Sequence, residues 1–271
     1  IGASPLISAL FYDEPSVETL NKIGVDFNAV GNHEFDKGSA ELLRLQNGGC
    51  KITNGAPDPN SCKGYGSAAP GTFDGAKFKW LSANVVSNAT GRTLLAPYGI
   101  KTFGGVRVAF IGMTLKGTPG IVTPTGVAGL TFNDEADTVN ALVPKLRASG
   151  VQAIVVLVHQ GGFQNAPVAG GTTSTNNSDI NGCVNNLKNT DGTPSDIANI
   201  VSRLSDAVDL VISGHTHAAY NCSKNTLDNG STARVAGLPN SVGRLVPVTR
   251  DRKSTRLNSS HIPLSRMPSS A

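Results

Sequence analysis

Four of the five histidines in this 271-residue chain follow closely on short apolar runs. They are His33, His159, His215 and His217, which come after residues 25–30, 153–158 and 208–212. Short apolar runs bounded by glycine are typical of buried strands in a mostly parallel sheet. Polar groups at the carboxyl ends of such strands converge on one edge, where α/β proteins bind ligands. Imidazoles and the side-chain amide of Asn32 are ligands for divalent metals, so the sequence predicts a metal site at this edge.

A structural role is the alternative for each of these histidines taken alone. A single histidine at a strand end is more often a hydrogen-bonded structural residue than a metal ligand. Four histidines with the same placement, two of them separated by one residue, favour the metal site. A loop that leaves its strand can turn both His215 and His217 inward.

Three motifs in a fixed order carry a resemblance to a known family. They are Gly31-Asn32-His33-Glu34, the strand-end histidine His159, and Gly214-His215-Thr216-His217. In this order they resemble the calcineurin-like metallophosphoesterases. The run up to Asp36, with Leu81-Ser82-Ala83-Asn84-Val85 downstream, is similar to the secreted bacterial 5′-nucleotidase and 2′,3′-cyclic-nucleotide 2′-phosphodiesterase branch. The resemblance covers most of residues 1–250. It implies an α/β fold, a four-layer sandwich of two central mixed β-sheets flanked by helices.

The resemblance also implies a site with two divalent metal ions. Asn32, His159 and His215 match the ligands of one metal, and His217 matches a ligand of the other. Histidine, asparagine and aspartate ligands suit zinc, manganese or cobalt, so the identity of the metals stays open. Two such cations activate a water and hold the phosphoryl oxygens.

His33 matches the catalytic histidine of the family, and Asp36 matches the carboxylate that orients it. In the implied reaction a hydroxide that bridges the metals attacks phosphorus in line, while His33 assists the leaving group. A carboxylate three residues further on can hold the imidazole in one tautomer. Asp36 could equally serve as the N-cap of a helix that starts near Lys37, and the two roles are compatible.

The implied function is metal-dependent hydrolysis of a phosphoester, with a nucleotide as the expected small-molecule substrate. A broader cyclic-nucleotide phosphodiesterase or sugar-nucleotide hydrolase is one alternative. A non-catalytic relative that keeps the fold and binds metal or ligand is another. In the resembled branch a C-terminal domain supplies the residues that bind the substrate, and we expect that domain in the complete protein.

Both ends of the sequence depart from the family pattern. Two motifs that the family carries upstream, Asp-x-His and Gly-Asp, are not found, and the chain begins at Ile1-Gly2-Ala3-Ser4-Pro5. We therefore expect a truncated reading frame that is inactive as given. Residues 251–271 resemble the conceptual translation of a sequencing-library adapter, and a natural basic tail for an acidic partner is the alternative. The expected organisation is one metallophosphoesterase domain over 1–250 and a non-domain tail over 251–271.

The charge of the chain gives no support to binding of a nucleic-acid polymer. The formal net charge is +4, but the segment 251–271 holds four basic residues and one acidic residue, which leaves +1 for the rest. No apolar stretch approaches the roughly 20 residues of a membrane span.

Four cysteines fall in two local pairs, Cys50 with Cys62 and Cys183 with Cys222. An even number without the Cys-x-x-Cys spacing of a zinc site suits two disulfides and an oxidising compartment, with four free thiols as the alternative. We therefore expect a periplasmic or secreted protein.

Periodicity and caps predict the elements that must position these residues. Helices are expected over 16–23, 37–46, 134–148 and 196–206, with Ser16, Asn133 and Ser195 as caps. Beyond the three apolar runs, strands are expected over 79–85, 98–102 and 106–113, and two closing strands within 233–249. Residues 47–76 are expected to form an irregular, cysteine-linked insertion, and residues 164–194 a long surface loop.

Two further positions leave alternatives open. Asn84 ends a predicted strand near the expected cleft, and satisfying local backbone groups is its favoured role. Gly161 and Gly162 could let the backbone approach a phosphate, or could form a turn that needs positive φ.

Overall fold

The computed structural model describes residues 2–64, 69–163, 187, 193–222 and 237–250, and the backbone of 166–167 and 173–174. The described chain forms two compact units. The first comprises the residues up to Asp26 together with His33–Phe78, and the second comprises Phe27–Asn32 and the residues from Lys79 onward. The predicted tail 251–271, most of the predicted loop 164–194 and Cys183 lie outside the described residues.

The first unit is built on short helices and a disulfide-linked loop. Its elements are α1 (Leu6–Ala9), α2 (Glu14–Ile23), α3 (Ser39–Asn47), β2 (Ile52–Thr53) and β3 (Ala56–Pro57), with the 3₁₀ helix η1 (Asn32–Phe35) at its border. The predicted helix 16–23 is confirmed, and Gly24 ends it in the left-handed conformation at φ 78°. Ser16 is not its cap: the helix begins two residues earlier, with Pro15 in its first turn and Asp13 at the N-cap position.

The second unit contains a six-stranded mixed sheet in the order β13-β16-β12-β9-β7-β6. Its strands are β6 (Tyr98–Phe103), β7 (Val106–Met113), β9 (Ala153–Val158), β12 (Leu210–Ser213), β13 (Tyr220–Asn221) and β16 (Val248–Arg250). The four strands β7, β9, β12 and β16 run parallel, and β6 joins β7 in the predicted antiparallel hairpin. The predicted parallel arrangement of 153–158 and 208–212 is therefore confirmed, because β9 and β12 are neighbours.

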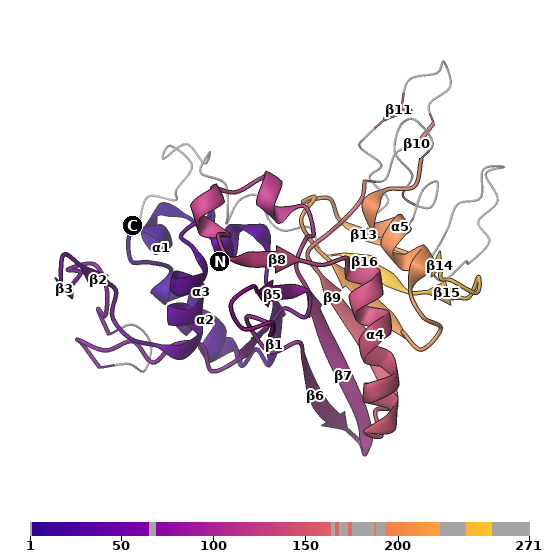
Figure 1. Cartoon of the computed structure of the whole chain (residues 1–271), viewed down its shortest axis with the longest axis horizontal. Coiled ribbons are helices and arrows are strands. Elements are labelled where there is room, and N and C mark those ends of the chain that lie inside the picture. Colours follow the sequence, from indigo (N-terminus) through magenta and orange to yellow (C-terminus); the bar gives the residue numbers. More distant parts are fainter. Residues whose placement is uncertain are drawn as a thin grey trace, which may run out of the picture. The chain divides into compact units, whose positions relative to one another are not determined.

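Helices cover one face of this sheet and a small parallel sheet packs on the other. Helices α4 (Glu135–Ala148) and α5 (Asp196–Arg203) bury their apolar stripes against β7, β9 and β12, and α4 lies along the sheet in Figure 1. On the opposite face β1 (Phe27–Ala29) pairs in parallel with β4 (Lys79–Leu81). This layered arrangement of helices and mixed sheets confirms the α/β class.

The remaining elements of the second unit are short. They are η2 (Thr118–Gly120), η3 (Pro124–Gly126), the antiparallel pair β5 (Val85–Ser87) and β8 (Leu130–Phe132), the pair β10 (Ala166–Pro167) and β11 (Thr173–Ser174), and the pair β14 (Leu238–Pro239) and β15 (Leu245–Val246). The pair β14–β15 and strand β16 lie in the predicted closing region 233–249. Asp134, not Asn133, caps α4, because its carboxylate accepts the Asp137 amide at 3.2 Å.

Asn84 serves the backbone around it. Its side-chain oxygen accepts the amide of Thr114 at 2.9 Å, and its side-chain nitrogen donates to the carbonyl oxygens of Thr114 at 2.7 Å and Asn133 at 3.0 Å. The residue is fully buried. These three bonds give Asn84 the local structural role that the sequence favoured.

Two glycines allow the β1–β4 pair to approach the six-stranded sheet. A Cβ at Gly112 would lie 2.3 Å from the Cβ and the carbonyl oxygen of Leu81, and a Cβ at Gly99 would lie 2.1 Å from the Phe27 ring. Neither position leaves room for a side chain, so the close packing of the two sheets requires glycine in mid-strand.

Replacing Gly112 by alanine should destabilise the protein by about 1–3 kcal/mol, because the new methyl group meets backbone that cannot move freely. Chemical denaturation would measure the change in free energy of unfolding. Gly120→Ala is the matched control, since its added Cβ meets nothing within 4 Å. Equal losses for the two variants would contradict the packing argument.

An ion pair joins the start of α4 to the end of α5. The Arg203 guanidinium donates to both carboxylate oxygens of Asp134, at 2.9 and 3.0 Å. Burial raises the pKa of the Asp134 carboxyl, but the hydrogen bonds from Arg203 and from the Asp137 amide outweigh it, and the pKa falls from 3.8 to about 2.

This pair predicts a loss of stability in acid. Because the folded-state pKa of Asp134 lies below its unfolded value, the stabilisation is fully present above about pH 5 and is lost as the pH falls towards 2. Allowing for solvent screening, we expect about 1–2 kcal/mol. Asp134→Asn keeps a capping side chain and removes the charge, so its deficit in unfolding free energy should shrink between pH 5 and pH 3. A deficit independent of pH would refute the assignment.

Candidate functional site

The sequence-predicted site residues fall in both units, and each unit is described by itself. In the first unit, the His33 Nδ1 atom lies 2.8 Å from the Asp36 carboxylate. Asp36 precedes α3 without capping it, because Gly38 occupies the N-cap position of that helix. Of the two roles considered for Asp36, the structure excludes the helix cap and shows a contact with the imidazole, while the orienting role stays a prediction.

The pair of His33 and Asp36 opens to solvent through a small pocket. The two side chains are 41% and 40% exposed. The pocket has a volume of about 120 Å³, and Asp13, Lys37 and Glu41 are among its other lining residues. A half-exposed imidazole held by a carboxylate can exchange protons with a bound molecule.

In the second unit, Asn32 and His159 meet directly although they are 127 residues apart in sequence. The side-chain oxygen of Asn32 lies 2.9 Å from His159 Nε2, and Asn32 is 4% exposed. His159 directly follows β9, and its backbone amide donates to the Met113 carbonyl at 2.9 Å at the end of β7. The carboxyl ends of parallel strands therefore bring these two predicted ligands together, as the sequence predicted.

His215 lies beside His159. Their ring centroids are 5.1 Å apart with an angle of 62° between the planes. His215 follows β12, the neighbour of β9 in the sheet. His159 thus contacts Asn32 on one side and His215 on the other, beside the carboxyl ends of β9 and β12, with two imidazoles and one amide oxygen as donors.

His217 is exposed and lies two residues further along the same loop. Among the described residues, no group of three or more His, Cys, Asp and Glu side chains is arranged to hold a metal ion. His159, His215 and His217 therefore do not form a three-histidine cluster in this structure. The assignment of His217 to a metal stays a prediction.

The backbone of this histidine loop is unusual. His215 and His217 have φ angles of 70° and 56°, a region that residues other than glycine seldom adopt. Such residues persist only where their surroundings hold them, and they are concentrated at functional sites. The backbone conformation and the sequence motif therefore indicate the same two residues, His215 and His217, as candidates for a functional role.

Sequence reasoning missed the residues that hold this loop. Arg250, which is 4% exposed, donates to the Thr216 hydroxyl at 2.9 Å and to the Ala218 carbonyl at 2.7 Å. The Thr216 hydroxyl in turn donates to the Gly162 carbonyl at 2.9 Å. Arg250 directly precedes the predicted non-domain tail 251–271. No local sequence pattern indicates that its side chain binds the loop of the Gly214-His215-Thr216-His217 motif.

Gly161 and Gly162 have a packing role that differs from both alternatives considered for them. A Cβ at Gly161 would lie 2.4 Å from the Gly214 carbonyl and 2.5 Å from the Thr216 hydroxyl. A Cβ at Gly162 would lie 2.7 Å from the Ser195 hydroxyl. Neither glycine has a positive φ. Gly161 is required because the loop after His159 packs against the loop that carries His215, and Gly162 because the same loop packs against Ser195 at the start of α5.

Cys50 and Cys62, one of the two local pairs, form a disulfide with an S–S distance of 2.05 Å, in line with the expected use of disulfides. Cys222 is also disulfide-bonded, and Cys183, the other cysteine of its local pair in the sequence, lies outside the described residues. Within the described part of the chain, no helix has the length and apolar character needed to cross a membrane.

Sequence relatives support the family assignment, although no family model matches the chain. The endonuclease YhcR of Bacillus subtilis is 35% identical over 221 residues, which cover 82% of this chain and 15% of that protein. The 5′-nucleotidase of Vibrio cholerae is 29% identical over 153 residues, which cover 56% of this chain and 23% of that protein. The chain therefore spans less than a quarter of the length of either relative.

Solved structures show the same fold. The 5′-nucleotidase precursor from Thermus thermophilus has a TM-score of 0.56 at 23% identity, over 92% of this chain and 37% of that one. The calcineurin-like phosphoesterase YfkN from Bacillus subtilis has a TM-score of 0.54 at 18% identity, over 91% of this chain and 60% of that one. The fold is that of the calcineurin-like phosphoesterases. Relatives named 5′-nucleotidase, together with this fold, support a place in the metallophosphoesterase family that includes the 5′-nucleotidases.

Proposed function

We propose that this chain is the metal-binding part of a hydrolase that cleaves phosphoesters of nucleotides with the help of divalent cations. The observation that carries the proposal is the contact of His159 with both Asn32 and His215 beside the carboxyl ends of β9 and β12. Relatives named 5′-nucleotidase favour a nucleotide as the substrate. Calcineurin-like phosphoesterases generally use divalent metal ions.

The donor set fits one divalent cation in part. Ligands of one cation at about 2.1 Å lie about 3 Å apart when they are at right angles, and the Asn32 oxygen and the His159 Nε2 atom are 2.9 Å apart. Asn32, His159 and His215 would hold this cation. For a second cation the described residues offer only His217, and we propose that the Asp-x-His and Gly-Asp motifs supply the other ligands in a longer protein.

When bound, the cations would supply Lewis-acid stabilisation of the phosphoryl oxygens and an activated water. The chain's own contribution is proton transfer by His33. A protonated imidazole can donate to the leaving oxygen as negative charge develops there. Asp36 would hold the Nδ1 side of the ring, which leaves Nε2 to face the substrate.

Phosphate release tests the proposal. A longer protein that carries the upstream Asp-x-His and Gly-Asp motifs would be loaded with Zn²⁺, Mn²⁺ or Co²⁺. It would then be incubated with AMP, a 2′,3′-cyclic nucleotide and a sugar nucleotide, before and after chelation. We expect metal-dependent release from at least one of them. A protein that carries the upstream motifs, binds metal and hydrolyses none of the three would be the non-catalytic relative.

Hydrolysis of a phosphodiester is a second candidate because the relative YhcR is named an endonuclease. The near-neutral charge of residues 1–250 speaks against a long nucleic-acid contact. A short oligonucleotide in the same assay separates the two candidates, since an endonuclease cleaves it internally and a 5′-nucleotidase releases phosphate from AMP.

We also propose that the protein works in the periplasm or outside the cell, together with a C-terminal substrate-binding domain. The disulfide between Cys50 and Cys62 suits an oxidising compartment. The chain covers only a part of its relatives, which leaves room for such a domain.

A further inference from the structure

The proposed reaction makes no use of Glu14, the first residue of α2, although its carboxylate is 1% exposed. It accepts hydrogen bonds from Arg44 Nη1 at 2.9 Å, from the Ser61 hydroxyl at 2.6 Å and from the Cys62 amide at 2.7 Å. A buried carboxylate persists only when such donors compensate its lost hydration. The site therefore supplies three hydrogen-bond donors to this one carboxylate.

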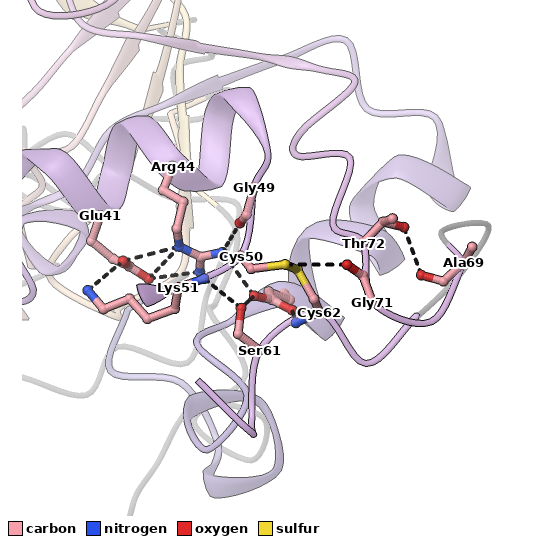
Figure 2. The surroundings of a disulfide bond; sticks show 11 residues. Glu41, Arg44, Gly49, Cys50, Lys51, Ser61, Cys62, Ala69, Gly71 and Thr72 are labelled. Carbon is pink, nitrogen blue, oxygen red and sulfur yellow. Dashed lines mark hydrogen bonds and ion pairs between the residues drawn. A yellow bond between two sulfur atoms is a disulfide. The ribbon is translucent and has the colours of Figure 1, made fainter. Parts of the chain in front are cut away.

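Arg44 connects this carboxylate to α3 and to the disulfide-linked loop. Its guanidinium is 10% exposed and donates to Glu41 at 2.8 Å and to the Gly49 carbonyl at 2.8 Å. Figure 2 shows the guanidinium between Glu41 on α3 and the loop that carries Cys50 and Cys62. We call the contacts of Glu14 with Arg44, Ser61 and Cys62 the Glu14 clamp.

A second tie runs parallel to the clamp. Lys37 Nζ lies 3.5 Å from the carboxylate of Asp13, whose side chain is 5% exposed. Asp13 precedes Glu14 in sequence, and Lys37 follows Asp36. The segment from Lys37 to Arg44 is therefore tied to the start of α2 near both of its ends, and Asp13 and Glu41 line the pocket that holds His33.

The contact between His33 and Asp36 cannot position the imidazole by itself. Both side chains are about two fifths exposed, and an exposed pair of this kind is worth only about 0–1 kcal/mol. The buried contacts of the clamp are stronger, because each donor lost there leaves a buried group without a partner.

We infer that Glu14 is a positioning residue for the pair of His33 and Asp36, acting through Arg44 and α3, with the disulfide-linked loop as its anchor. The expected effect of Glu14 on turnover rests on the proposed function. Its expected effect on the placement of His33 and Asp36 does not. Loss of a clamp contact should loosen the turn that holds Asp36, in which the Asp36 amide donates to the His33 carbonyl at 3.2 Å.

The test uses Glu14→Gln and the milder Ser61→Ala, with Asp206→Asn as the control. The control removes a carboxylate that pairs with Arg244 in the other unit. Hydrogen exchange would report the protection of the Asp36 amide, and the ¹⁵N resonance of His33 Nδ1 would report its contact with Asp36. We expect about tenfold faster exchange and a moved resonance in both clamp variants, and no change in the control.

Unchanged exchange and an unchanged His33 resonance in the folded Ser61→Ala variant would overturn the inference, even if Glu14→Gln did not fold. A moved resonance without any hydrolysis in the wild type would support the positioning role while the proposed function failed. In an active protein, the clamp variants should lower kcat about tenfold with little change in KM. A rise in KM with kcat unchanged would also contradict the inference.

Discussion

Replacing His33 by alanine should lower turnover by about 10²–10⁴-fold while leaving the bound metal unchanged. The imidazole is half exposed, contacts Asp36 at 2.8 Å and lines a pocket in the first unit. Asn32, His159 and His215 gather in the second unit without it. Its loss therefore removes a proton donor and leaves this ligand set complete.

Steady-state kinetics and metal analysis on the same preparation would measure both quantities, in a protein that carries the upstream ligands. Asp36→Asn serves as the graded variant, since it keeps the side-chain volume and should cost about 10–100-fold by weakening the hold on the imidazole. Equal loss of metal and turnover in His33→Ala would assign His33 to the metal instead of to the leaving group.

In contrast to the loss of His33, replacing His215 should reduce metal affinity by at least about 100-fold, and turnover should be lost along with the metal. The choice of substituent matters because His215 has a φ of 70°. Alanine keeps the strained conformation, whereas glycine adopts it without cost. His215→Gly should therefore lose the metal while keeping, or slightly raising, the free energy of unfolding.

Metal titration and thermal unfolding of His215→Ala and His215→Gly would separate the two effects. We expect both variants to lose metal. We also expect the alanine variant to have a lower free energy of unfolding than the glycine variant. Full metal stoichiometry in either variant would refute the role of His215 as a ligand. His33→Ala is the reciprocal control, because it should keep the metal.

The local signals of the sequence predicted the elements well and their ends less well. The runs that became β9 and β12 were found from apolar residues alone, since a buried parallel strand needs little else. Three of the four predicted helix starts differ from the structure by one or two residues, and α5 begins at the predicted residue. Asn133 and Asp134 can both cap a helix, and the hydrogen bond that the Asp137 amide donates to the Asp134 carboxylate decided between them.

The sequence by itself determined the class of fold, the family motifs and the identity of the residues at the sheet edge. Only the tertiary structure decided which of them meet, as Asn32 and His159 do across 127 residues, and which groups hold them there. The contacts of Arg250 with the loop that carries His215, and of Glu14 with Arg44, belong to the second kind. The physical reason is the sequence separation over which each interaction acts. Strand periodicity and glycine turns involve neighbouring residues, whereas hydrogen bonds to a buried charged side chain join residues that are far apart in sequence and meet only in the folded chain.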